Sequence, residues 1–147
     1  MKLYNPEIWD NNDPTYGDMS DFDATGYHNQ QLWIICLGRG DIFYWGNVDD
    51  LDPKKYNHKQ MEKISKGRGI HPHYGNIDDL DPSVYDYSMM SWVAFGRGSQ
   101  KAYANIDDLD PVKDGLNQYD LWEQSVERAE KIRKTNNPEG TEVEWFD

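Results

Sequence analysis

The side chains of this sequence with the greatest capacity for chemistry are aspartates, which recur in one short motif. The motif Asn-x-Asp-Asp-Leu-Asp-Pro, called the aspartate motif below, occupies residues 47–53, 76–82 and 105–111, with a constant spacing of 29 residues. Clustered carboxylates can bind a hard cation, act as acids or bases, or present a negative surface to a partner. Each of these possibilities makes different demands on the rest of the chain.

Calcium binding is one interpretation of the aspartate motif. Residues 47–52 place one asparagine and three aspartates at close intervals, as loops for hard cations do. An EF-hand loop also requires a central glycine and a glutamate at its twelfth position, which the motif lacks. The sequence therefore predicts no metal site and no cofactor, and a calcium-stabilised repeat protein is kept as the second alternative.

Enzymatic chemistry has weak support from the residues. Of the four histidines, only His71 and His73 are close together, and no cysteine or helical His-Glu pair accompanies them to complete a zinc site. No phosphate-binding glycine loop or nucleophile elbow is present. Carboxylates are so abundant that no single pair stands out as a general acid and base. We therefore predict a protein that is not an enzyme.

A surface that binds a partner is the remaining possibility. The predicted partner-binding residues are the first two aspartates of each motif, two N-terminal acids and the aromatic residue that precedes each motif: Asp49, Asp50, Asp78, Asp79, Asp107, Asp108, Asp18, Asp21, Trp45, Tyr74 and Tyr103. Three structural interpretations compete with this one. The aspartates could be solvated turn residues, the aromatic residues could be packing, and Arg39, Arg68 and Arg97 could simply pair with neighbouring carboxylates.

The elements that position these residues follow from the repeat. Residues 32–56, 61–85 and 90–114 align without gaps, and residues 1–30 form a fourth, degenerate copy. Segments 33–37 and 91–95 are rich in β-branched and aromatic residues and precede a Gly-Arg-Gly sequence, which is typical of a strand that enters a hairpin turn. A second strand is expected over 41–45 and at its counterparts. The third aspartate of each motif, followed by proline, predicts the N-cap of a short helical turn.

The chain after Asn117 changes character. Asp120 and Glu123 resemble a capping box, apolar residues recur at helical spacing, and the Asn-Asn-Pro sequence that begins at Asn136 predicts the end of the helix. We expect this helix to cap the repeats. The predicted architecture is α+β, with antiparallel β-hairpin repeats of period 29, short helical turns and a C-terminal capping helix. It is a single domain over 1–147, divided into the degenerate repeat 1–30, three hairpin repeats in 31–116, and the helix and acidic tail 117–147.

Bulk composition limits the remaining function classes. The 147 residues carry a net charge of −12, which makes direct binding to nucleic acid an unattractive interpretation. The six Trp and ten Tyr predict a half-buried aromatic core. Cys36 is the only cysteine, which is typical of a reducing compartment, and no apolar run approaches the length of a membrane span. These features predict a cytoplasmic protein, in the host cytoplasm if a phage encodes it.

The leading functional hypothesis is a non-enzymatic inhibitor that mimics the charge of nucleic acid. Carboxylates repeated along a rigid scaffold would block a basic, nucleic-acid-binding protein of the host, such as a CRISPR effector or a restriction enzyme. In this general character the chain is similar to phage-encoded anti-defence proteins. The alternative is a repeat scaffold that binds a protein or a small ligand through its aromatic face. The sequence predicts no oligomeric state.

Overall fold

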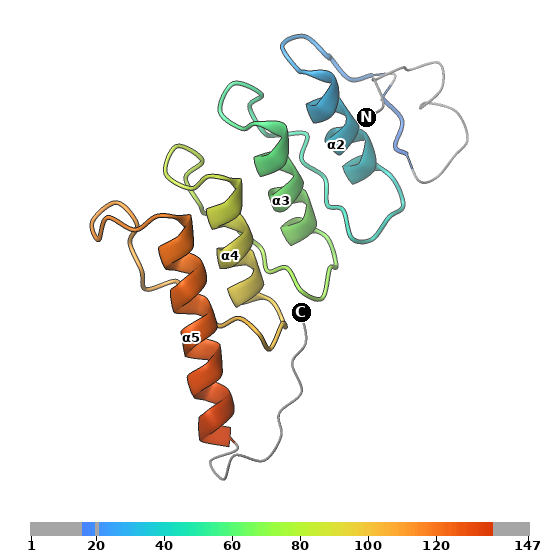
Figure 1. The fold of residues 1–147 in the computed structure, drawn as a ribbon. Coiled ribbons are helices and arrows are strands. Elements are labelled where there is room, and N and C mark those ends of the chain that lie inside the picture. Colours follow the sequence, from blue (N-terminus) through green and yellow to red (C-terminus); the bar gives the residue numbers. More distant parts are fainter. Residues whose placement is uncertain (1–15, 20, 137–147) are drawn as a thin grey trace. The chain divides into compact units, whose positions relative to one another are not determined.

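The computed structural model describes residues 16–19 and 21–136. These residues contain four α-helices and no β-strand: α2 (Asn29–Arg39), α3 (His58–Arg68), α4 (Tyr87–Arg97) and α5 (Gln118–Asn136) (Figure 1). The chain divides into two compact units, the first ending at His71 and the second beginning at Pro72. In the first unit α2 packs against α3, and in the second α4 packs against α5.

The predicted β-hairpin repeats are wrong. Segments 33–37 and 91–95, which we expected to be strands, lie inside α2 and α4. The Gly-Arg-Gly sequence is not a hairpin tip, because its arginine is the last residue of the helix and its second glycine is the C-cap. Segment 41–45, expected as a second strand, is a turn followed by irregular backbone. The described part of the chain is therefore helical rather than α+β.

The physical reason for the helices lies in the spacing of the buried residues. Each repeat buries side chains at three equivalent positions of its helix, spaced i, i+3 and i+4, which places them on one helical face. In α2 these are Leu32, Ile35 and Cys36, and in α4 they are Met90, Val93 and Ala94. Ile34 and Ile35 of α2 are β-branched, but the burial of this face outweighs their modest preference for strands.

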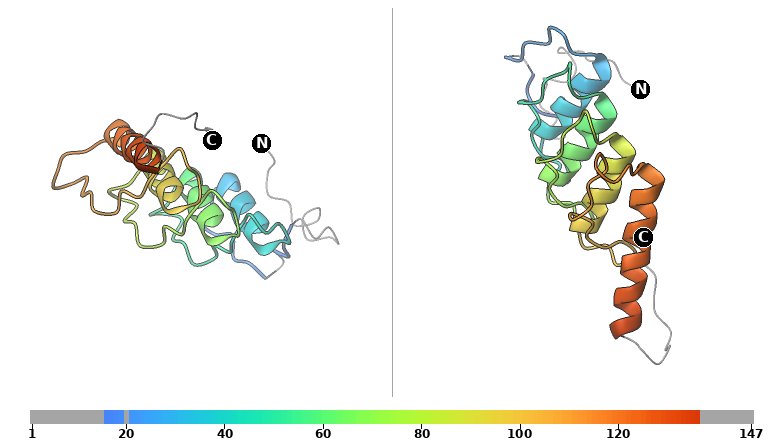
Figure 2. Two further views of the ribbon diagram at one scale, coloured as in Figure 1. Left: turned by 90° about the horizontal axis from the view of Figure 1, so that it is seen from below. Right: turned by 90° about the vertical axis from the view of Figure 1, so that its left-hand side faces the viewer.

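A loop completes each repeat by running back along the helix that follows it. Gly46, which precedes α3, donates its N–H to the carbonyl of Ser65 at 2.8 Å, and Gly75 donates equivalently to Ala94 of α4 at 2.8 Å. A Cβ atom on Gly46 would lie 2.4 Å from the Cβ of Arg68, so the close approach requires glycine. Within each unit the helices form one layer and the loops form the other (Figure 2).

The aspartate–proline sequence forms a single helical turn rather than the start of the following helix. The side chain of Asp52 accepts the N–H of Lys54 at 2.9 Å, and the carbonyl of Asp52 accepts the N–H of Tyr56 at 3.1 Å. Helix α3 itself begins after the N-cap Asn57, whose side chain accepts the N–H of Gln60 at 2.8 Å. The aspartate therefore caps a turn that leads into the helix.

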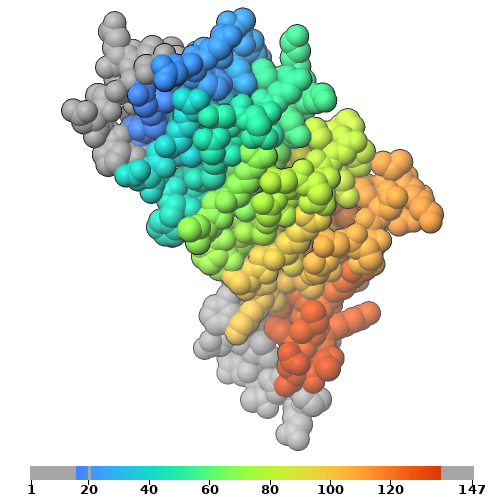
Figure 3. Space-filling model, turned by 180° about the vertical axis from the view of Figure 1, so that it is seen from behind, coloured from blue at the N-terminus to red at the C-terminus, as the bar shows by residue number. Residues whose placement is uncertain are grey.

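The interior of the described residues is mainly aliphatic, which corrects the expectation of an aromatic core. Val48 and Leu51 of the first unit and Ile77 and Leu80 of the second are buried beside the apolar helix faces. Tryptophan and tyrosine side chains are instead half-buried or exposed. Figure 3 shows how the loop that joins α2 to α3, coloured cyan to green, forms a continuous band on one face of the first unit.

The helix predicted after Asn117 is present as α5. Its N-cap is Asn117, which exchanges hydrogen bonds with Asp120: the Asn117 side chain accepts the Asp120 N–H at 3.0 Å, and the Asp120 carboxylate accepts the Asn117 N–H at 2.9 Å. The acidic tail 137–147 and residues 1–15 of the degenerate repeat lie outside the described residues. Among the helices that are described, none combines the length and apolar character needed to cross a bilayer.

Candidate partner-binding surface

The arginine near the end of the first three helices, and its counterpart within α5, organises the aspartate motifs. Arg97 donates through Nη1 to the carbonyl of Asn76 at 2.8 Å and through Nη1 and Nη2 to the carboxylate of Asp79 at 2.6 and 3.0 Å. We call this arrangement the arginine clamp. The same pattern joins Arg68 to Asn47 and Asp50, and Arg128 to Asn105 and Asp108.

The clamp also reaches the first aspartate of the motif that follows the helix. The Nε of Arg97 donates to Asp107 at 2.8 Å, so one guanidinium lies between Asp79 of one loop and Asp107 of the next. In the first unit, Arg39 donates to the carboxylate of Asp49 at 2.9 Å and to the backbone carbonyl of Asp18 at 2.7 Å. In the second unit, carboxylates far apart in the sequence therefore become neighbours around one guanidinium.

The electrostatics of the clamp follow from these forked hydrogen bonds. Hydrogen bonds from Arg68, Arg97 and Arg128 lower the pKa values of their bidentate partners below the ordinary value of 3.8; these partners are Asp50, Asp79 and Asp108. The hydrogen bonds that Arg97 donates to the Asp79 carboxylate raise the pKa of Arg97 in turn. Each of the three aspartate side chains is nevertheless 66% exposed. The clamp thus fixes the carboxylates in place while leaving them at the surface.

The aspartate motifs at 47–53, 76–82 and 105–111, with their clamp arginines, are called the loop edge below, and they retain negative charge despite the arginines. Each repeat contributes three motif aspartates and one clamp arginine, a balance of −2. Packed helices lie about 8–10 Å apart, so within a unit the edge carries one net charge per about 5 Å, whereas duplex DNA carries one per about 1.7 Å. The charge density of the edge is therefore about a third of that of duplex DNA.

The other predicted acids, Asp78, Asp18 and Asp21, are exposed. Asp78 is exposed, and its N–H donates to the side chain of Asn76 at 2.8 Å, which closes the turn at the start of the motif. Asp18 and Asp21 are exposed, and Asp18 joins the clamp of Arg39 through its backbone. The structure thus gathers predicted residues around each arginine, although much of that contact is internal to the chain.

The predicted aromatic residues are engaged mainly in packing. The rings of Tyr74 and Tyr103 lie 4.9 and 5.1 Å from the ring of Phe95 on α4. In the first unit, the Nζ of Lys66 lies 5.5 Å from the centre of the Trp45 ring. All three predicted residues are half-buried. Their geometry matches the packing interpretation more closely than a shared face for ligand stacking.

A hollow on the helix side of the second unit was not predicted. It has a volume of about 420 Å³ and lies between α4 and α5, lined by Ser88, Trp92, Gln118, Tyr119 and Trp122. The Nε1 of Trp92 is buried and has no hydrogen-bond partner in the described part of the chain. Tyr119 is 70% exposed and Trp122 is 41% exposed. Ser88 and Trp92 on α4, and Gln118 and Trp122 on α5, are spaced i,i+4 and so lie on one face of each helix. This signal could have been used only if the segment of α4 had been predicted as a helix rather than a strand.

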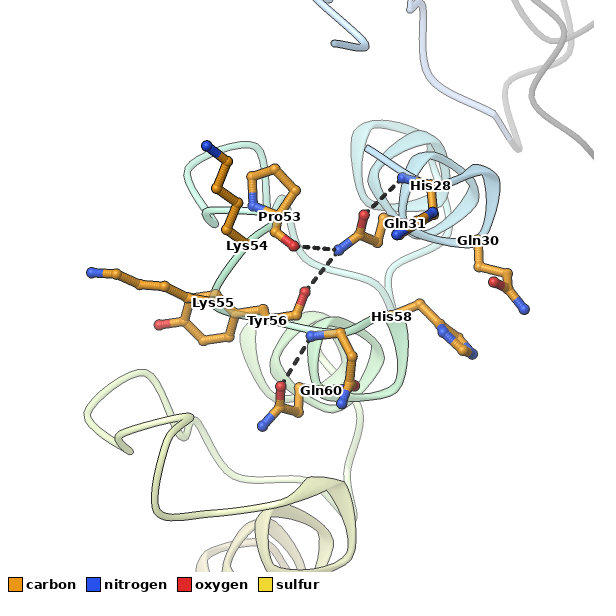
Figure 4. Close-up of a pocket in the computed structure, with 10 residues that line it drawn as sticks. His28, Gln30, Gln31, Pro53, Lys54, Lys55, Tyr56, His58 and Gln60 are labelled. Atoms are coloured by element: carbon orange, nitrogen blue, oxygen red, sulfur yellow. Dashed lines mark hydrogen bonds between the residues drawn. The ribbon is translucent and has the colours of Figure 1, made fainter. Parts of the chain in front are cut away.

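A second hollow, in the first unit, is a polar joint between α2 and the following loop (Figure 4). The buried Gln31 side chain donates to the carbonyls of Pro53 and Tyr56 at 3.0 and 2.7 Å and accepts the N–H of His28 at 2.8 Å. The side chains of Lys54 and Lys55 extend away from Gln31. These contacts give the hollow a structural role.

Metal binding has no geometric support in the residues that the structure describes. Residues 16–19 and 21–136 contain no group of three or more His, Cys, Asp or Glu side chains arranged to hold an ion. Oxygens of Asp50 and Asp79 accept hydrogen bonds from arginine.

Comparisons with known proteins give no independent guide to this surface. No protein-family model, no curated protein and no solved structure matches the chain.

Proposed function

We propose that this protein is a non-enzymatic, acidic inhibitor that acts in the cytoplasm by covering the basic surface with which a host protein binds nucleic acid. The observation that supports this most directly is the arginine clamp, which holds exposed carboxylates at repeated positions with a balance of −2 per repeat. A carboxylate already held in one conformation loses little side-chain entropy when a partner binds it. Rigid positioning thus partly compensates for a charge density below that of DNA.

The third aspartate of each motif offers a clean test of this proposal. Asp52, Asp81 and Asp110 are exposed and cap turns, and asparagine is an equally good cap. The triple substitution D52N/D81N/D110N therefore removes three charges from the loop edge while the caps and the clamps persist. As a matched control, E123Q/E127Q/E130Q removes three charges from α5.

The assay is capture of host proteins on the immobilised full-length chain at about 50 and 500 mM salt, where screening lengths differ severalfold. The proposal predicts salt-sensitive capture of a protein that duplex DNA displaces. D52N/D81N/D110N should reduce the amount of this protein captured, because three ionic contacts with it are lost. The α5 control E123Q/E127Q/E130Q should capture as much as the wild type. Capture that DNA leaves intact, or equal losses in both variants, would contradict the proposal.

A second candidate function is a repeat scaffold that binds a partner through aromatic side chains. The specific observation in its favour is the hollow between α4 and α5, where Tyr119 and Trp122 are exposed beside the buried Nε1 of Trp92. Such a partner would bind with little dependence on salt. In the same capture assay, Y119A/W122A would abolish its binding and D52N/D81N/D110N would not.

A further inference from the structure

An exposed apolar cluster lies at one end of the first unit. Phe43, Tyr44 and Ile70 have exposed fractions of 57%, 40% and 76%. The rings of Phe43 and Tyr44 are 4.2 Å apart, and the Ile70 N–H donates to the carbonyl of Phe43 at 2.6 Å. The two segments are thus held together, and we call these three residues the aromatic cluster. Adjacent apolar side chains of this size at a surface commonly mark an interaction site.

The repeat itself shows that the fold does not require these apolar residues. Ile70 occupies the position that is Asp41 in one copy and Ser99 in another. Tyr44 corresponds to Ala102, and Phe43 corresponds to Lys101. Polar or small side chains therefore satisfy the same turn elsewhere in the chain. The fold of the repeat therefore does not require the apolar side chains of the aromatic cluster.

The aromatic cluster adjoins the acidic loop edge. The backbone at Tyr44 lies very close to Gly69: a Cβ atom on Gly69 would lie 2.2 Å from the carbonyl oxygen of Tyr44. One residue earlier, Arg68 clamps Asp50, whose carboxylate is 66% exposed. Asp41 is also exposed, two residues before Phe43. The exposed rings of the aromatic cluster are therefore close along the chain to the carboxylate of Asp41 and to the Arg68–Asp50 pair.

This combination fits cationic side chains of a partner. Cations bind the faces of aromatic rings, and the described residues include such contacts: Lys66 Nζ lies over the ring of Trp45 at 5.5 Å, and Arg39 Cζ lies over the ring of Phe22 at 4.9 Å. A second copy of the chain fits poorly, because it would bring Asp41 and Asp50 of two strongly acidic molecules together.

We propose that the aromatic cluster is the anchor point for arginine side chains of the partner protein, with their guanidinium groups stacked on Phe43 and Tyr44 and paired with Asp41 and Asp50. This inference deepens the proposed function and rests on it, because it names the chemistry of the partner. Arginine stacks on aromatic faces and forms forked pairs with carboxylates, whereas lysine acts as a compact, strongly hydrated charge. The site should therefore prefer arginine to lysine at equal net charge.

The test measures the affinity of the full chain for two labelled peptides, nona-arginine and nona-lysine, by fluorescence anisotropy at about 50 and 300 mM salt. A cation–aromatic contact at an exposed site corresponds to about two- to five-fold in affinity, so nona-arginine should bind at least that much more tightly. The charge-neutral variant F43A/Y44A/I70S should reduce the preference for nona-arginine by about two- to five-fold while keeping the salt dependence, because the carboxylates remain. Two of its three substitutions are residues that the chain carries at equivalent positions.

The matched control is Val112→Ser, which removes another exposed apolar side chain and places there the residue found at the equivalent position Ser83. V112S should keep the full preference for arginine, and circular dichroism should show that both variants are folded. A wild-type chain that binds both peptides equally, with salt sensitivity, would overturn the aromatic anchor and leave the acidic binding function intact. Absence of binding to either peptide would overturn both proposals.

Self-association is the competing occupant of the aromatic cluster, and sedimentation equilibrium distinguishes it. The proposal expects the same molecular mass for the wild type and F43A/Y44A/I70S. A dimer that becomes a monomer in the triple variant would assign the cluster to contacts between copies and would overturn the arginine anchor.

Discussion

Removal of one arginine clamp should measurably destabilise the second unit. Arg97 is the best choice, because its guanidinium bonds simultaneously to Asp79, Asp107 and the carbonyl of Asn76. Its side chain is only 19% exposed, although those of Asp79 and Asp107 are 66% and 45% exposed. R97A removes every one of these bonds. R97K keeps the charge but cannot form the fork.

The expected cost follows from the exposure of the partners. Ion pairs to carboxylates this exposed contribute about 0.5 kcal/mol each. The bond to the Asn76 carbonyl adds about 1 kcal/mol. R97A should therefore lower the free energy of unfolding by about 2 kcal/mol, which corresponds to a decrease of about 4–8 °C in Tm for a chain of this size. R97K should recover part of this loss.

Urea titration followed by helical circular dichroism measures this change, with Lys134→Ala as the control. Lys134 pairs with Glu130 at 3.1 Å, but the two side chains are 75% and 47% exposed, so K134A should cost less than about 0.5 kcal/mol. If R97A unfolds at the same urea concentration as the wild type, or if K134A costs as much, the clamp has no structural role beyond that of an ordinary surface pair.

Two further predictions concern close packing and pH. Gly75→Ala would place a Cβ 2.4 Å from the Cβ of Arg97, so it should lower the free energy of unfolding by about 1–3 kcal/mol in the same urea assay. The control is Ala104→Gly at the equivalent position, which should not increase the free energy of unfolding, because the chain already accommodates a Cβ there. Because the clamps lower the pKa values of Asp50 and Asp79, their stabilisation is complete above the ordinary pKa of 3.8 and is lost as the pH falls through the lower folded value. As the pH is lowered below about 4, Tm should therefore decrease, and it should decrease less steeply with pH in D79N than in the wild type. The same dependence of Tm on pH in D79N and the wild type would contradict this.

The sequence was sufficient to define the repeat but not the type of element inside it. Identical spacing of the aspartate motif defined the period and the sites of the loops, and the polar and apolar pattern after Asn117 predicted α5. Segment 33–37 misled the prediction because its β-branched residues are also compatible with a helix once one face is buried. Leu32, outside that segment, completes the helical face with Ile35 and Cys36.

The arginine partners of the predicted aspartates could not be predicted, for a related reason. The aspartates could be identified by type and repetition, but their partner arginines lie 18 residues along the chain and meet them only because a helix turns the chain back. A hairpin would have placed Arg68 and Asp50 at opposite ends. Because the pairing of arginine with aspartate depends on the fold, predicting strands in place of helices also left the aspartates without their arginine partners. The predicted surface was therefore more negative than the surface in the structure.

The loop before α5 differs from its counterparts in length. Arg128 reaches Asp108 across 20 residues, whereas Arg97 reaches Asp79 across 18, and the clamp geometry is the same. Gly115, with a φ of 64°, lies in this longer loop and takes a left-handed conformation that suits glycine. Residues 112–116 consequently offer an insertion point, where an epitope or a reporter peptide could be placed without disturbing the charged contacts on either side.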